Sequence, residues 1–93
     1  MSRRFQVNAP GVVSEVIDGE AIIMNLRSGH YFSAQGVGAS LWIGLESGSL
    51  EADIVTHVAT HYAMGAAEVT VALASFIREL ATHDLVVDRD TRA

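Results

Sequence analysis

The sequence predicts an α+β fold in which a three-stranded antiparallel sheet is followed by three helices, in the order βββααα. Apolar residues alternate with a period of two as far as Ser33 and then recur with the period of a helix. Asp18-Gly19 stands between two β-branched segments and is a strong signal for a two-residue hairpin turn. The expected helices meet at Ser47-Gly48-Ser49, so the order is also compatible with a helix-turn-helix core.

The first half of the chain contains the strands. Its first two segments are rich in Val and Ile, whose branched side chains fit a pleated surface. A turn at Arg27-Ser28-Gly29 then leads into a short aromatic segment. The predicted strands are residues 12–17, 20–26 and 30–33. The outer strands of such a meander keep unpaired backbone N–H and C=O groups.

The second half contains the helices. Ser47-Gly48-Ser49 ends the first, and Glu51 and Asp53 stand near the N-terminus of the second, where negative charge is favourable. Ala63-Met64-Gly65 separates the second from a third helix that begins at Glu68. The apolar positions at helical spacing are Val37, Leu41, Trp42 and Leu45, then Leu50, Ile54, Val58 and Tyr62, then Val69, Leu73, Phe76, Ile77 and Leu80. We expect these helices to form a layer against the sheet.

Length and composition favour a small binding module. A chain of 93 residues makes one domain, and we expect a flexible arm over 1–10, the domain over 11–88 and a frayed end over 89–93. The net charge of −5 argues against binding to nucleic acid, which needs clustered Lys and Arg. The lack of Cys excludes disulfides and thiolate chemistry, and no apolar segment approaches the ~18 residues of a membrane span. We therefore expect a cytoplasmic protein with neither nucleic-acid nor membrane partners.

The residues that could carry chemistry form no recognisable catalytic or metal site. His57 and His61 lie four positions apart, a spacing at which two imidazoles can share a metal, with Asp53 a turn earlier. A glutamate directly after His57 and an obvious third ligand are both missing, so we interpret the pair as a polar helix flank. Gly36-Val37-Gly38 lacks the third glycine and the Lys of a phosphate loop. We expect no catalytic residue, no metal and no cofactor.

The order and spacing of several segments resemble the PqqD family over about residues 11–88. The resemblance rests on the hairpin, His30-Tyr31-Phe32, Gly38 with Trp42, Leu45-Glu46-Ser47-Gly48, Ile54, Tyr62, Phe76 with Leu80, and Leu85-Val86. It implies a winged helix-turn-helix-like domain that is not an enzyme. Such a domain binds the leader of a ribosomally synthesised precursor peptide and hands it to a modifying enzyme, such as a leader peptidase, a cyclase or a radical enzyme.

The chain departs from the family pattern at three positions. Ala34 and Gln35 replace a common Leu-Asn pair, and Ala72 replaces a common acidic residue. The proline-glutamate signature of members devoted to pyrroloquinoline quinone is also missing. The resemblance therefore favours a lasso-peptide pathway or another peptide pathway over assembly of the quinone cofactor.

The resemblance implies that the leader adds as an antiparallel strand to the third strand and lies between it and the third helix. The residues indicate the same surface, because strand 30–33 is an edge beside apolar helices. Two questions stay open: whether His30 and Phe32 or Tyr31 and Ser33 turn their backbone groups outward, and whether Phe76 lines a groove or belongs to the core. The expected peptide-binding residues are His30, Tyr31, Phe32, Ser33, Val69, Ala72, Leu73, Phe76 and Glu79.

A winged-helix domain that binds DNA or regulates another protein is the alternative. A helix that reads DNA should be rich in Lys and Arg, whereas the third helix has Glu68, Glu79 and only Arg78. Peptide binding through backbone pairing should depend weakly on salt, and a steep loss of affinity with salt would indicate nucleic acid.

Overall fold

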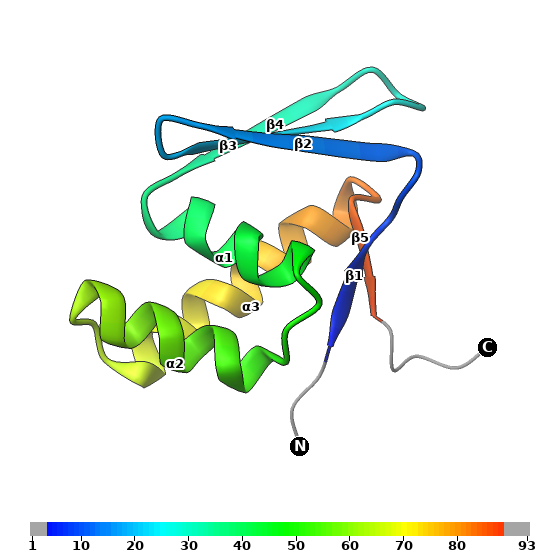
Figure 1. Ribbon diagram of the computed structural model, residues 1–93. Helices are drawn as coiled ribbons and strands as arrows, with labels where there is room; N and C mark the ends of the chain where they lie inside the picture. The colour runs from blue at the N-terminus through cyan, green and yellow to red at the C-terminus, as the bar shows by residue number, and fades with distance from the viewer. Residues whose placement is uncertain (1–3, 89–93) are drawn as a thin grey trace.

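A computed structural model describes residues 4–88 of the chain as a sheet with helices packed on one of its faces (Figure 1). The elements are β1 (Phe5–Val7), β2 (Val12–Ile17), β3 (Glu20–Asn25), β4 (Tyr31–Gln35), α1 (Val37–Glu46), α2 (Glu51–Tyr62), α3 (Ala66–Thr82) and β5 (Val86–Asp88). Strands β2, β3 and β4 form an antiparallel meander, followed by the three helices. The predicted α+β class and its βββααα order are therefore confirmed.

The β2–β3 hairpin turns at Asp18-Gly19, as the sequence predicts. Both residues have positive φ, +52° and +79°, which a two-residue turn of this type requires. The third strand differs from its expected bounds, since it runs from Tyr31 to Gln35. It continues past Ser33 because Gln35 still pairs with Glu20, and Gly36, with φ +56°, then separates the strand from α1.

The core lies between the inner face of the meander and the helices. Trp42 on α1 is fully buried, and its Nε1 donates a hydrogen bond to Ser14 Oγ on β2 at 3.0 Å. Ser14 in turn donates to Glu46 Oε2 at 2.7 Å. Helices α1 and α2 cross so closely that a Cβ atom added at Gly44 would lie 2.8 Å from Ile54 Cγ1. The layer beneath the sheet is thus held by both hydrogen bonds and close packing.

Residues 5–7 are not part of a flexible arm, contrary to the expectation for residues 1–10. They form β1, which pairs antiparallel with β5 in a separate two-stranded sheet. Phe5 is only 9% exposed and belongs to the core, and Arg4 forms a β-bridge with Leu50. The burial of Phe5 and the backbone pairing give this segment enough contacts to stay in place. The expected frayed end, 89–93, lies outside the described residues.

Candidate functional site

Strand β4 is an outer strand of the meander, and its Phe32 lies beside Phe76 of α3. Asn25 N donates to the carbonyl of His30 at 2.9 Å, so this facing pair is hydrogen-bonded. Such pairs recur at every second residue of an antiparallel ladder, and therefore Phe32 pairs with β3. Tyr31 and Ser33 turn their backbone N–H and C=O groups outward, where no strand of residues 4–88 pairs with them. The Asn25–His30 pair, which closes the β3–β4 turn, thus shows that Tyr31 and Ser33, rather than His30 and Phe32, turn their backbone groups outward.

The side chain of Phe32 connects this edge to α3. Its ring centroid lies 6.4 Å from that of Phe76 and 6.0 Å from that of His83. Phe32 and Phe76 are both only partly buried, so their rings remain accessible between the strand and the helix. Tyr31 points to the opposite face of the sheet and is 70% exposed. Phe76 therefore packs against the core and also lies beside the Phe32 ring of β4.

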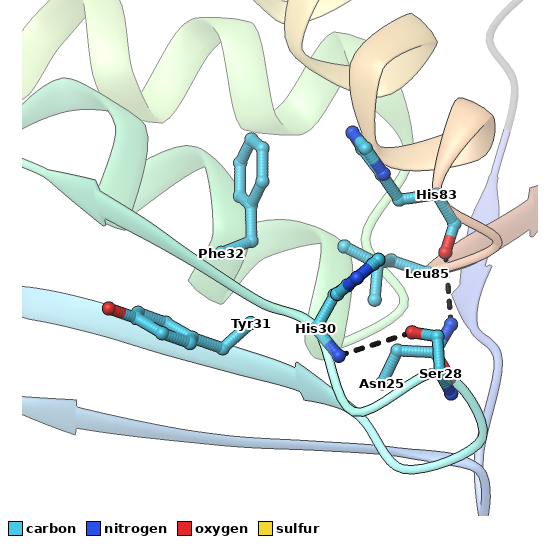
Figure 2. Close-up of a pocket in the computed structure, with 7 residues that line it drawn as sticks. All are labelled: Asn25, Ser28, His30, Tyr31, Phe32, His83 and Leu85. Carbon is cyan, nitrogen blue, oxygen red and sulfur yellow. Dashed lines mark hydrogen bonds between the residues drawn. The ribbon is translucent and has the colours of Figure 1, made fainter.

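A pocket of about 260 Å³ lies at the start of β4 (Figure 2). Its lining consists of Asn25, Ser28, His30, Tyr31, Phe32, His83 and Leu85. Leu85 is 2% exposed and supplies apolar surface, and the imidazoles of His30 and His83 lie around the same space. An apolar base with a few polar groups at its rim is typical of pockets that bind one side chain of a ligand.

The structure brings two of the predicted site residues, Phe32 and Phe76, side by side and buries two others. Tyr31, Phe32 and Ser33 lie on β4 and His30 directly precedes it, whereas Ala72, Phe76 and Glu79 lie on α3. Val69 is 0% exposed and Leu73 is 1% exposed, so both are core residues. This burial argues against direct contact of either side chain with a peptide, because both face the core from the apolar face of α3, and the other predicted site residues stay a prediction.

Four residues of the pocket were not predicted as site residues: Asn25, Ser28, His83 and Leu85. His83 and Leu85 reach the site only because α3 ends beside the β3–β4 turn, a contact between segments far apart in the chain. Asn25 offered a local signal, since it is a polar residue at an inward-facing strand position directly before a turn.

The two histidines of α2 stack at a centroid distance of 6.1 Å. Within residues 4–88, no group of three or more His, Cys, Asp and Glu side chains is placed to hold a metal ion. His57 instead lines a separate hollow of about 240 Å³ between α1 and α2, together with Asp53. The expectation that the chain needs no metal stays a prediction. No helix in the described part of the chain has the length and hydropathy needed to cross a membrane.

Comparison with known proteins identifies relatives for most of the chain. The family profile described as "Coenzyme PQQ synthesis protein D (PqqD)" matches residues 20–86. No curated protein matches the chain significantly. One similar solved structure is described as "TbiB1 in Complex with the TbiA(beta) Leader Peptide"; it is 30% identical, with 95% of this chain and 99% of that chain covered and a TM-score of 0.81.

A second similar structure is described as "Lasso peptide synthetase B1 complexed with the leader peptide". It is 18% identical, with 89% of this chain and 96% of that chain covered and a TM-score of 0.79, and it shows that the fold is shared. The family profile, in contrast, matches well over half of the chain and includes β3, β4 and all three helices. The chain therefore belongs to the PqqD family.

Proposed function

We propose that this protein binds the leader segment of a ribosomally synthesised precursor peptide by β-strand addition along β4. The bound leader would extend the meander as a further antiparallel strand and lie against the flank of α3. The domain itself catalyses no reaction and presents the peptide to a modifying enzyme. A leader peptidase or cyclase of a lasso-peptide pathway is the favoured partner, and a radical enzyme is the alternative.

The open backbone edge at Tyr31 and Ser33 is the observation that carries this proposal. An added strand obtains its affinity from main-chain hydrogen bonds and its specificity from pockets that take alternate side chains. The edge offers the main-chain hydrogen bonds. The rings of Phe32, Phe76 and His83, with the adjoining pocket, offer the surface for side chains. The same surface therefore has both parts that strand addition needs.

The relatives support the proposal through what they bind. The 30% identical structure is described as a complex with a leader peptide, and so is the second structure of the same fold. Within this chain, the proposed contacts are the backbones of Tyr31 and Ser33 and the side chains of His30, Phe32, Ala72, Phe76, Glu79 and His83. Val69 and Leu73 support the groove from the core.

Hydrogen exchange of single amides tests the proposal. A displayed library of leader segments from peptide precursors is first selected on the protein, and the tightest binder, here named the selected leader, is then synthesised. Its binding should slow exchange at the amides of Tyr31 and Ser33, which donate outward in the free protein. The amide of Phe32 should already be protected, because it donates within the meander.

The other edge of the meander provides the control. Val16 on β2 also turns its backbone outward, because Leu26 N donates to the Gly11 carbonyl at 2.8 Å and the pairs alternate from there. Its amide should exchange at the same rate with and without the selected leader. Unchanged exchange at both Tyr31 and Ser33 in the complex, or no enrichment of any leader over its scrambled sequence, would contradict the proposed function.

A further inference from the structure

Among residues 4–88, Asn25 is the one polar residue that is buried, with 8% of its surface exposed. Its Oδ1 accepts hydrogen bonds from the backbone N–H groups of Arg27 at 2.9 Å and Ser28 at 3.3 Å. Its Nδ2 donates to the carbonyl of His83 at 3.0 Å. A buried amide left without partners would be costly, so these bonds determine how the side chain is oriented.

The bonds of Asn25 hold two sides of the pocket at the start of β4. On the strand side, its backbone N donates to His30, and Ser28 Oγ accepts from His30 N at 3.2 Å. On the helix side, its side chain holds the carbonyl of His83, whose ring lies 6.0 Å from Phe32 (Figure 2). Asn25 therefore connects the turn before β4 to the end of α3.

The carbonyl of His83 needs such a partner because of how α3 ends. The last carbonyls of a helix have no partners within it. Asp84 has φ +58°, and Leu85 N donates back to the carbonyl of Leu80 at 2.9 Å, which reverses the chain after His83. The carbonyl of His83 is left at the helix terminus, and Asn25 reaches it from the sheet.

A second asparagine provides a matched comparison on the other side of the same turn. Asn8 Nδ2 donates to the carbonyl of Asp84 at 3.0 Å, one residue along from the carbonyl that Asn25 holds. Asn8 follows β1 and is not among the residues that line the pocket. Both asparagines thus donate to carbonyls at the end of α3, but of the two only Asn25 also lines the pocket.

We propose that Asn25 is a positioning residue for peptide recognition. By tying the turn before β4 to the end of α3, it determines the width of the pocket and hence which side chain of the bound peptide the pocket accepts. This inference rests on the proposed function, because it takes the pocket to be part of the peptide groove. It predicts an energetic coupling between Asn25 and one residue of the peptide.

The variant Asn25→Asp removes the bond to the helix and places a carboxylate beside the carbonyl of His83. Its carboxylate can still accept from the turn N–H groups, but it cannot donate to the carbonyl of His83. We expect the selected leader to bind about three- to tenfold more weakly by fluorescence anisotropy, the effect of one lost hydrogen bond. The matched variant Asn8→Asp loses the same kind of bond and should leave affinity unchanged.

A glycine scan of the selected leader separates positioning from a general loss of structure. At the peptide residue that occupies the pocket, substitution by glycine should abolish the difference between the parent protein and Asn25→Asp. At every other position the difference should persist. If Asn25 only stabilised the fold, the loss would be the same for all peptides, and this outcome would overturn the inference.

A second variant covers the case in which the aspartate prevents folding. Asn25→Ser carries no charge, keeps a short acceptor for the turn and is too short to replace the donor to His83. The same coupling to one peptide position is expected. A folded Asn25→Ser with parental affinity for all peptides would overturn the inference while leaving the proposed function in place. If binding in the parent protein does not involve the amides of Tyr31 and Ser33, the proposed function and this inference are both wrong.

Discussion

Proline substitution at neighbouring positions of β4 should separate peptide binding from folding. Ser33 turns its backbone N–H outward, whereas Ala34 faces Ala21 in the ladder and donates within the meander. Proline removes the backbone donor at either position without adding charge. Ser33→Pro should therefore weaken binding and keep the fold, whereas Ala34→Pro should keep the outward edge but destabilise the sheet.

The expected magnitudes follow from the partners of each N–H group. Ser33→Pro loses one hydrogen bond to the peptide, a net ~0.5–1.5 kcal/mol, or about three- to tenfold in Kd, and any clash of the ring adds to this. An edge strand tolerates proline where its N–H faces solvent. Ala34→Pro leaves the carbonyl of Ala21, a residue that is 0% exposed, without its partner. That loss should cost about 1–3 kcal/mol of unfolding free energy.

Two assays measure these effects on the same proteins. Urea denaturation followed by the fluorescence of Trp42, the one Trp of the chain, gives the unfolding free energy. Fluorescence anisotropy of the labelled selected leader gives Kd. Val16→Pro is the matched control, since it places proline at an outward position of β2, away from the proposed groove, and should change neither quantity by much. A folded Ser33→Pro with full affinity would refute strand addition at β4, and an Ala34→Pro as stable as the parent would refute the assigned hydrogen-bond pattern.

Three further predictions concern the core and the mode of binding. Trp42→Phe should lower the unfolding free energy by ~2 kcal/mol, because it loses the bond to Ser14 and leaves a cavity. Because this variant lacks the fluorescent reporter, its urea denaturation is followed by circular dichroism, and a change below ~0.5 kcal/mol would contradict the prediction. Gly44→Ala should cost about 1–3 kcal/mol in the same assay, since the added Cβ would lie 2.8 Å from Ile54, and an unchanged midpoint would show that the helices separate easily. The Kd of the selected leader should change little between low and moderate salt if backbone pairing and apolar pockets dominate. A steep linear fall of the logarithm of affinity with the logarithm of salt concentration would instead indicate binding like that of nucleic acid.

The sequence by itself determined the local elements and their order. The turn at Asp18-Gly19, the change of period after Ser33 and the break at Ser47-Gly48-Ser49 each depend on residues close together in the chain. Backbone preferences of glycine and β-branched residues act over such short distances, and therefore the meander, the three helices and the buried position of Trp42 could all be read in advance. The choice of strand 30–33 as the expected peptide-binding edge followed from the family resemblance, together with its place at the end of the meander beside apolar helices.

The tertiary structure alone decided how distant segments meet. Pairing of β1 with β5 joins Phe5 to Asp88, and no local pattern marks either short strand as a partner of the other. Packing of α3 beside the sheet brought the ring of Phe76 to 6.4 Å from that of Phe32 on β4, and both residues stay only partly buried.

The outward direction of Tyr31 and Ser33 likewise depended on a single fact that the sequence does not contain. The Asn25–His30 pair closes the turn before β4, and a shift of that pair by one residue would reverse the direction of every backbone group along the strand. The hydrogen bond from Asn25 to the carbonyl of His83 joins residues 58 positions apart, and it forms only because α3 ends beside that turn. Local propensities act within a few residues, whereas these features depend on how the helices and strands pack against each other. Only the folded chain could therefore reveal the pocket and the place of Asn25 in it.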